Sequence, residues 1–327
     1  MTTPSPTYSQ GFAEGVSEEM RRDPTIVVLG TDLLVRGGHW AQLKGVGQEF
    51  GPTRVFDTPI SEAAMVAAGV GAAVTGLRPI VDLNFVDFVF GAMDEVINQA
   101  AKLRYMMGVD VPVVIRATAG IAGGAEQHNN SLDMWFAGTP GLLVAVPAFP
   151  ADNKGLIKTA LRGRDPVVFL MHKKLTGFRG PVGGEDDLVP FGRAVVRRPG
   201  SGLTIVAYGY MVHVALRAAE TLAAEGIDAE VIDLRTLMPL DMATVETSVR
   251  RTGRAMVVTE SPVFGSAASE VAAEIEEHAF AWLDAPVLRV GAPYAPVPHS
   301  QPMLDTIAPD ERRVAEAARR LAGWSIS

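Results

Sequence analysis

Two side chains in this sequence could carry acid–base chemistry. Glu62 is a single carboxylate at the start of an almost wholly apolar segment that continues to Val74. Burial in such a segment is costly for a carboxylate unless something binds it, and it raises the pKa, so Glu62 could hold or share a proton near neutral pH. His128 stands near the end of a glycine-rich loop that begins at Gly120, and histidine is the side chain that titrates closest to neutrality.

Each of these residues also has a structural interpretation. An acid in the first turn of a helix is favoured by the helix dipole, and Ser61 before Glu62 is a good N-cap residue. A lone histidine is more often a hydrogen-bonded structural residue than a catalytic one. The segment 61–74 has no polar face, so as a helix we expect it to be buried on all sides.

Short apolar runs alternate with helical patterns along the chain, which predicts an α/β layer fold. The runs are apolar throughout, as in parallel sheets that are covered on both faces. The expected strands are 25–29, 79–83, 111–116, 142–146, 167–171, 203–207, 229–234, 255–259 and 286–290. The expected helices are 61–74, 90–107, 151–162, 212–225, 241–252, 266–277 and 310–321.

The length of 327 residues predicts two domains. A stretch rich in glycine, proline and acidic residues interrupts the α/β pattern, and such composition is typical of a linker. We therefore expect a first domain at 1–175, a linker at 176–191 and a second domain at 192–327.

Composition excludes several classes of function. The net charge of −8 argues against nucleic acid as a partner. The absence of cysteine excludes disulfides, thiolate metal sites and a cysteine nucleophile. Residues 1–9 lack the apolar core of a signal peptide and no long apolar run predicts a membrane span, so we expect a cytoplasmic protein without a membrane partner.

The stretch Asp57-Thr58-Pro59-Ile60-Ser61-Glu62 resembles a signature of the β subunit of thiamine-diphosphate-dependent 2-oxo acid dehydrogenases. The resemblance implies that the Glu62 carboxyl hydrogen-bonds the aminopyrimidine ring of the cofactor, with Ile60 among the cofactor-binding residues. Phe88 matches an aromatic residue that stacks on the same ring. His128, in Gln127-His128-Asn129, matches a histidine that faces the substrate.

Several residues depart from the family pattern, among them Asn129, Thr31 and Gly91. Asn129 stands where the family has serine, which puts the hydrogen bonding around the imidazole of His128 in question. Thr31 and Gly91 stand at positions where members of the family carry acids, which are thought to belong to an acidic tunnel between paired active sites. Proton communication of that kind is therefore doubtful in this chain.

The resemblance also implies the fold and the partners. It predicts two doubly wound parallel-sheet domains: a transketolase-like pyrimidine-binding domain and a transketolase C-terminal-type domain. The family holds the cofactor diphosphate through Mg²⁺ bound by a Gly-Asp-Gly segment, and no such segment occurs in this sequence. We therefore expect this chain to supply no metal ligand, and expect the Mg²⁺ to be bound mainly by a separate α subunit in an α2β2 heterotetramer.

The implied activity is oxidative decarboxylation of a 2-oxo acid with transfer of the acyl unit to a lipoyl group of an E2 acyltransferase. In this interpretation His128 orients or protonates the substrate or the lipoyl group. Pyruvate is the leading substrate. Acetoin is second, because the stretches 20–24 and 85–88 look particularly like acetoin dehydrogenase β subunits, and branched-chain 2-oxo acids are third. The alternative from another class is a non-catalytic scaffold subunit, suggested by Thr31, Gly91 and Asn129.

Overall fold

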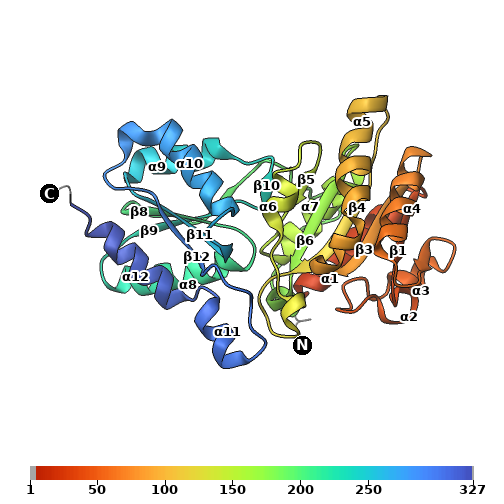
Figure 1. Cartoon of the computed structure of the whole chain (residues 1–327), viewed down its shortest axis with the longest axis horizontal. Helices are drawn as coiled ribbons and strands as arrows, with labels where there is room; N and C mark the ends of the chain where they lie inside the picture. Colours follow the sequence, from red (N-terminus) through yellow and green to blue (C-terminus); the bar gives the residue numbers. More distant parts are fainter. Residues whose placement is uncertain (1–4, 326–327) are drawn as a thin grey trace. The chain divides into compact units, whose positions relative to one another are not determined.

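The computed structural model describes residues 5–325, and its contacts divide the chain into two units (Figure 1). Unit 1 contains Met1–Ala119 and Trp135–Phe191, and unit 2 contains Gly120–Met134 and Gly192–Ser327. The loop that carries His128 therefore packs with the C-terminal part of the chain.

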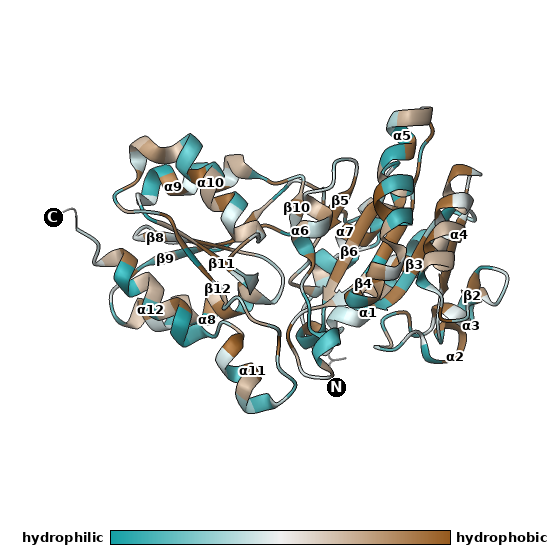
Figure 2. Ribbon diagram, in the orientation of Figure 1, coloured by the Kyte–Doolittle hydropathy of each residue, from teal (hydrophilic) through white to brown (hydrophobic). Residues whose placement is uncertain are grey.

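Six strands of unit 1 form a parallel sheet in the order β5-β6-β4-β3-β1-β2. They are β1 (Ile26–Gly30), β2 (Val55–Asp57), β3 (Arg78–Phe85), β4 (Val114–Ala119), β5 (Leu143–Ala145) and β6 (Val167–His172). Figure 2 shows the brown of apolar residues along β3, β4 and β6. Apart from β2, these strands are mostly buried, as expected for largely apolar strands in a parallel sheet that helices cover on both faces.

The helices of unit 1 are α1 (Tyr8–Arg22), α2 (Leu33–Arg36), α3 (Val46–Phe50), α4 (Glu62–Val74), α5 (Ala101–Met107) and α7 (Pro150–Arg162). A short helix, α6 (Asp133–Ala137), lies where the chain passes from the unit 2 segment back into unit 1. The sequence did not predict α1, which packs against α7. It begins with a capping box, in which Thr7 and Gln10 each accept a backbone N–H of the other.

The prediction that the helix at 61–74 is buried on all sides is wrong. Gly69 lies on the buried face of α4, where an added Cβ would be 2.4 Å from Cγ2 of Val81 on β3. Ala67, Ala68 and Gly71 lie on the opposite face and are exposed. Alanine and glycine make a segment apolar without requiring that every face be covered, so the pattern overstated the burial.

The helix predicted at 90–107 is not one regular helix. It consists of a 3₁₀ helix at Val86–Ala92, a π-helical turn at Glu95–Ala100 and then α5. π-Helical turns inside α-helices occur frequently at functional sites. This irregular segment follows directly after the end of β3 and contains Phe88.

Unit 2 contains a second sheet in the order β12-β11-β8-β9-β7, in which only β7 is antiparallel to its neighbour. Its strands are β7 (Val195–Arg198), β8 (Leu203–Ala207), β9 (Ala229–Asp233), β11 (Ala255–Pro262) and β12 (Leu288–Ala292), and β10 (Thr236–Met238) is a further short strand. Its helices are α8 (Tyr210–Ala224), α9 (Met242–Thr252), α10 (Ala267–Ala279), α11 (Gln301–Ile307) and α12 (Glu311–Ala322), with short 3₁₀ turns at Glu126–His128 and Phe280–Trp282. The predicted class of two parallel-dominated α/β domains is confirmed.

Across residues 5–325, none of the helices combines the length and the apolar character that crossing a membrane would require.

Candidate active site

The carboxyl ends of β1, β2 and β3 lie side by side at one edge of the unit 1 sheet. Gly30, the last residue of β1, is paired with Asp57 of β2 on one side and with Asp82 of β3 on the other. A Cβ added to Gly30 would lie 3.0 Å from Cβ of Asp82, so this close approach favours glycine. Parallel α/β sheets bind ligands beyond the carboxyl ends of their strands, and the segments after β2 and β3 are therefore the candidates.

The two acids of the segment after β2 have different surroundings. Asp57 accepts the backbone N–H groups of Leu33, at 2.5 Å, and Leu34, at 3.2 Å, and so caps the start of α2. Glu62 is half-buried as the first residue of α4, and its carboxylate has no hydrogen bond or ion pair with any described residue. Ser61 occupies the N-cap position but its side chain makes no capping hydrogen bond. Glu62 is thus the acid of this motif that is left open to a ligand.

Phe88 lies in the 3₁₀ helix that follows β3. Its ring meets the ring of Phe85 edge-on, with centroids 5.6 Å apart. Phe85 in turn contacts the ring of Trp40 at 5.9 Å, and Nζ of Lys173 lies 5.6 Å from its centroid. Phe88 is half-buried, so part of its ring remains accessible. Because α4 packs against this 3₁₀ helix, Glu62 and Phe88 lie on contacting elements.

Ile60 precedes the helix of Glu62 and is 80% exposed. A large apolar side chain exposed to this degree beside a half-buried carboxylate is available to contact a ligand or another chain. The structure therefore brings three of the four predicted site residues to the same part of unit 1. Their roles in catalysis and in cofactor binding stay predictions.

A buried polar network that the sequence reasoning missed lies at the same edge of the sheet. NH1 of Arg116 is 3.2 Å from Oδ1 of Asp82, and both side chains are at most 1% exposed. Asp82 also accepts from Nε2 of Gln42 at 2.6 Å and from the backbone N–H of Asn84 at 2.9 Å. Asn84 in turn donates to Oγ1 of Thr31 at 2.7 Å.

This network fixes the path of the chain from β3 into the segment of Phe88. Asn84 adopts a φ of +61°, a conformation that non-glycine residues rarely use and that the surrounding bonds must hold in place. Thr31, at one of the positions where the family carries acids, acts here as a neutral acceptor for Asn84. Asp82 and Arg116 could have been noticed in the sequence, because each interrupts an otherwise apolar strand.

His128 belongs to unit 2, in a loop closed on itself by Asn129. Oδ1 of the buried Asn129 accepts the N–H of Ala122 at 3.1 Å, and its Nδ2 donates to the carbonyl of Ala125 at 2.9 Å. His128 is half-buried at the end of a 3₁₀ turn. Asparagine at position 129 therefore serves to hold the loop that carries the imidazole.

Several contacts anchor this loop to the rest of unit 2, and three of them are spread along its length. The backbone N–H of Ile121 donates to Oε2 of Glu260 at 2.9 Å. The Nδ1–H of His299 donates to the carbonyl of Gly124. At the far end of the loop, the hydroxyl of Tyr208 donates to Oδ2 of Asp133. The position of His128 is thus determined by residues that lie far away in the sequence.

Asp133 and Tyr208 are both buried. Burial raises the pKa of the Asp133 carboxyl above its ordinary value of 3.8. The hydrogen bonds from Tyr208, from the backbone of Met134 and from Ser261 lower this pKa, but by less than burial raises it. Burial also raises the pKa of Tyr208 well above 10, and the nearby charge of Asp133 adds to this effect. Tyr208 shares a further hydrogen bond of 2.6 Å with Thr259.

We expect Tyr208→Phe to destabilise the chain more at high pH than at low pH. The variant removes one donor to Asp133, which costs about 1 kcal/mol when the carboxyl is protonated. A folded-state pKa above the unfolded value means that stability falls as the pH rises through the folded pKa, because the folded carboxyl keeps a proton that the unfolded chain releases. Without the hydrogen bond from Tyr208 the pKa of the Asp133 carboxyl rises further. The loss of stability caused by the substitution should therefore grow as the pH rises from about 4 to about 8.

Urea unfolding at about pH 4.5 and about pH 8 measures this difference. Tyr294→Phe is the control, because Tyr294 lies in the same unit and is 83% exposed. An equal destabilisation by Tyr208→Phe at both pH values would contradict the proposed coupling to Asp133.

Comparison with known proteins identifies the family. The transketolase pyrimidine binding domain matches residues 4–178 and the transketolase C-terminal domain matches residues 192–314. The beta subunit of acetoin:2,6-dichlorophenolindophenol oxidoreductase from Cupriavidus necator is 44% identical, over 94% of this chain and 94% of its own. The beta subunits of 2-oxoisovalerate dehydrogenase and of the pyruvate dehydrogenase E1 component from Bacillus subtilis are 40% and 41% identical, over 97% and 96% of this chain and 98% of each relative. The chain belongs to the E1 β-subunit family.

A solved structure agrees with this assignment. A split gene transketolase, described as an inactive beta4 tetramer, superimposes on this E1 β chain with a TM-score of 0.81 at 26% identity, over 97% of this chain and 98% of that one. The predicted resemblance is therefore confirmed, and the scaffold alternative is not favoured. As an E1 β subunit, the chain is one component of an oxo acid dehydrogenase of the thiamine-diphosphate-dependent class.

Proposed function

We propose that this E1 β chain acts with a separate α subunit in the oxidative decarboxylation of a 2-oxo acid, with acyl transfer to the lipoyl group of an E2 acyltransferase. The observation that carries the proposal is the Glu62 carboxylate. It is half-buried, it has no partner among the described residues, and its helix packs against the 3₁₀ helix of Phe88.

The residues at this edge of unit 1 fit the pyrimidine half of thiamine diphosphate. An aminopyrimidine needs a hydrogen-bonding group at its ring nitrogen and an apolar surface against its face, and Glu62 and Phe88 supply these two features, with Ile60 as a further apolar contact. When bound, thiamine diphosphate supplies the nucleophilic carbon and the electron sink of the reaction.

Glu62 has the proton-handling role in this proposal. Its carboxyl hydrogen-bonds the ring nitrogen and holds or releases one proton there during the reaction. Phe88 keeps the ring in place, and the network around Asp82 and Arg116 keeps the segment of Phe88 in place. His128 orients or protonates the substrate or the lipoyl group, with Asn129 and the Asp133–Tyr208 pair as positioning residues.

The exposed apolar surface on unit 1 supports the proposal that a partner subunit binds there. The outer face of α4 carries exposed alanine and glycine. At the end of α5, Tyr105, Met106 and Met107 are 95%, 57% and 69% exposed. Aromatic residues and methionine are enriched in protein interfaces, and contiguous apolar surface marks interaction sites. We assign these surfaces to contact with neighbouring subunits in an α2β2 heterotetramer, and we assign the diphosphate and Mg²⁺ mainly to the α subunit.

We expect thiamine diphosphate with Mg²⁺ to bind tightly only when this chain is mixed with its α subunit. The reason is that the chain offers the pyrimidine side of the site but no Gly-Asp-Gly segment for the diphosphate. Calorimetry on the chain alone, on α alone and on the mixture tests this, together with the mass of the mixture. Tight binding by the chain alone would contradict the split site, and no binding by the mixture would contradict the enzymatic function.

Pyruvate is the proposed substrate. The relatives named above differ in substrate by name, yet their identities to this chain are similar, between 40% and 44%, so identity alone does not select a substrate. A screen of the reconstituted enzyme against pyruvate, 2-oxoisovalerate and acetoin decides among them by kcat/KM. For the domains, we propose the boundaries expected from the sequence: a first domain at 1–175, a linker at 176–191 and a second domain at 192–327.

A further inference from the structure

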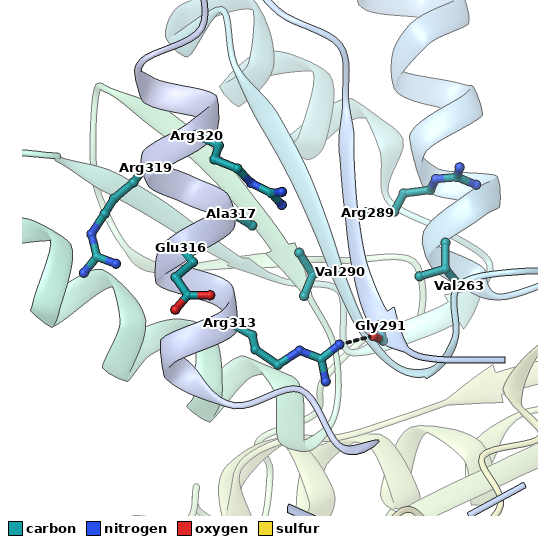
Figure 3. Close-up of a pocket in the computed structure, with 9 residues that line it drawn as sticks. All are labelled: Val263, Arg289, Val290, Gly291, Arg313, Glu316, Ala317, Arg319 and Arg320. Atoms are coloured by element: carbon teal, nitrogen blue, oxygen red, sulfur yellow. Dashed lines mark hydrogen bonds between the residues drawn. The ribbon is translucent and has the colours of Figure 1, made fainter. Parts of the chain in front are cut away.

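A groove in unit 2 runs between strand β12 and helix α12, and none of its lining residues is assigned to the reaction (Figure 3). Its volume is about 540 Å³, which is within the usual range of small-molecule sites. β12 is the outermost strand on its side of the sheet. The residues that line the groove are Val263, Arg289, Val290, Gly291, Arg313, Glu316, Ala317, Arg319 and Arg320.

The groove has an excess of positive charge on a chain whose net charge is −8. Arg319 is neutralised by Glu225 through two hydrogen bonds of 2.7 Å, and Figure 3 shows it on the side of α12 that faces away from β12. Glu316 is paired with Arg312 at 3.0 Å. Two of the five charged residues of the groove are therefore already compensated.

The other three charged residues are arginines without an acidic partner among residues 5–325. NH1 of Arg289 donates only to the hydroxyl of Ser269, at 2.9 Å. Arg320 extends from α12 toward β12 and makes no hydrogen bond to the described residues. Arg289 points away from α12 (Figure 3), so an anion between β12 and α12 would meet the guanidinium groups of Arg313 and Arg320, neither of which is paired with a carboxylate.

Arg313 is held in place before any ligand arrives. Its NH1 donates to the carbonyl of Ile307 at 3.0 Å and its NH2 to the carbonyl of Gly291 at 3.1 Å. Both acceptors are neutral, so the charge of Arg313 is not compensated. Its side chain is only partly exposed. A fixed guanidinium loses less conformational entropy on binding an anion than a mobile one.

Arg313 and Arg320 share one face of α12. They are two turns apart, a rise of about 10.5 Å, and Ala317 lies between them. With Val290 of β12, which points toward α12 (Figure 3), Ala317 gives the groove an apolar floor between the two arginines. A ligand that fits both features has an anionic group for the arginines and a short aliphatic body for the floor.

We propose that this groove is a binding site for a small organic phosphate, a phosphomonoester with a short apolar body. A phosphate group carries up to two charges and three acceptor oxygens, so it can accept from two guanidinium groups at once. The inference is independent of the proposed function, because no groove residue takes part in it.

Calorimetric titration of the full-length chain with n-butyl phosphate at low salt tests the proposal. We expect saturable binding at one site per chain, and binding tighter than that of inorganic phosphate because the butyl group covers the apolar floor. Arg320→Gln should weaken the binding of n-butyl phosphate by about 10-fold or more, the loss typical of a charge-assisted hydrogen bond. Arg320 is the better target, since Arg313 also joins α12 to β12 and its loss could affect folding.

Arg217→Gln is the matched control, because Arg217 is an exposed arginine of the same unit that lies outside the groove. It should change the affinity less than about 2-fold, since its charge is paired with Glu311 and its side chain does not line the groove. A second variant, Val290→Thr, keeps the shape of the floor but adds a hydroxyl group. It should reduce the advantage of n-butyl phosphate over inorganic phosphate and leave the affinity for inorganic phosphate unchanged.

Three outcomes would overturn the proposal. The first is no saturable binding of n-butyl phosphate. The second is an equal loss of affinity in Arg217→Gln and Arg320→Gln, which would mean unspecific attraction to positive charge. The third is tighter binding of succinate than of n-butyl phosphate, which would assign the groove to dicarboxylates.

Discussion

Replacing Glu62 by glutamine is expected to abolish turnover of the reconstituted enzyme while thiamine diphosphate still binds. The amide keeps the shape of the side chain and can still hydrogen-bond a ring nitrogen, but it cannot hold or release a proton there. Loss of a general acid–base group costs about 10²- to 10⁴-fold in rate, so kcat should fall by at least about 10²-fold with little change in the affinity for the cofactor. Steady-state kinetics and calorimetry on the same preparation measure both quantities.

Glu311→Gln is the matched control for this experiment. Glu311 is also the first residue of a helix, behind the N-cap residue Asp310, but it lies in α12 and is exposed. If Glu62 served only to complement the helix dipole, both variants would lose about 0.3–1 kcal/mol of stability and keep their activity. Substantial activity of Glu62→Gln would therefore reject the catalytic assignment in favour of the structural one.

The second large effect is expected at the buried ion pair of Arg116 and Asp82. Arg116→Ala leaves the carboxylate of Asp82 buried without its cation, although Gln42 and the backbone of Asn84 still donate to it. Breaking a buried pair in this way costs about 3–5 kcal/mol. Because Asp82 also holds the backbone at Asn84, where the chain leaves β3 toward Phe88, we expect the variant to lose activity as well. Urea unfolding of the variant measures the free energy.

Two comparisons separate this effect from simple loss of charge. Arg36→Ala removes the cation of an exposed pair with Asp32, in which both side chains are 60% exposed, and should cost no more than about 1 kcal/mol. The double variant Arg116→Met/Asp82→Leu replaces the buried pair by apolar groups and should be more stable than Arg116→Ala, since no uncompensated charge remains. If Arg116→Ala lowered the free energy of unfolding by less than Arg36→Ala does, the buried network would not have the importance that we expect.

The amino-acid sequence by itself determined much of the alternation of strands and helices, although not α1, β2, β7 or α11, and it determined the identity of the family. Strand β8 and the end points of α4, α7 and α9 agree with the expected ranges to within one residue, because the apolar periodicity that encodes them is a short-range property of the chain. Glu62 could also be singled out locally, since a lone acid before an apolar helix is visible without any knowledge of the fold.

Only the tertiary structure decided which surfaces and side chains meet. Gly69 packs against Val81 while Ala67 faces outward, a distinction that the uniformly apolar sequence of α4 does not contain. Arg116 meets Asp82 across 34 positions and Tyr208 meets Asp133 across 75. The arginine groove likewise joins β12 to α12. Such contacts depend on how distant segments come together, and no local pattern of the chain encodes that, so the loop of His128 could be assigned to unit 2 only after the fold was known.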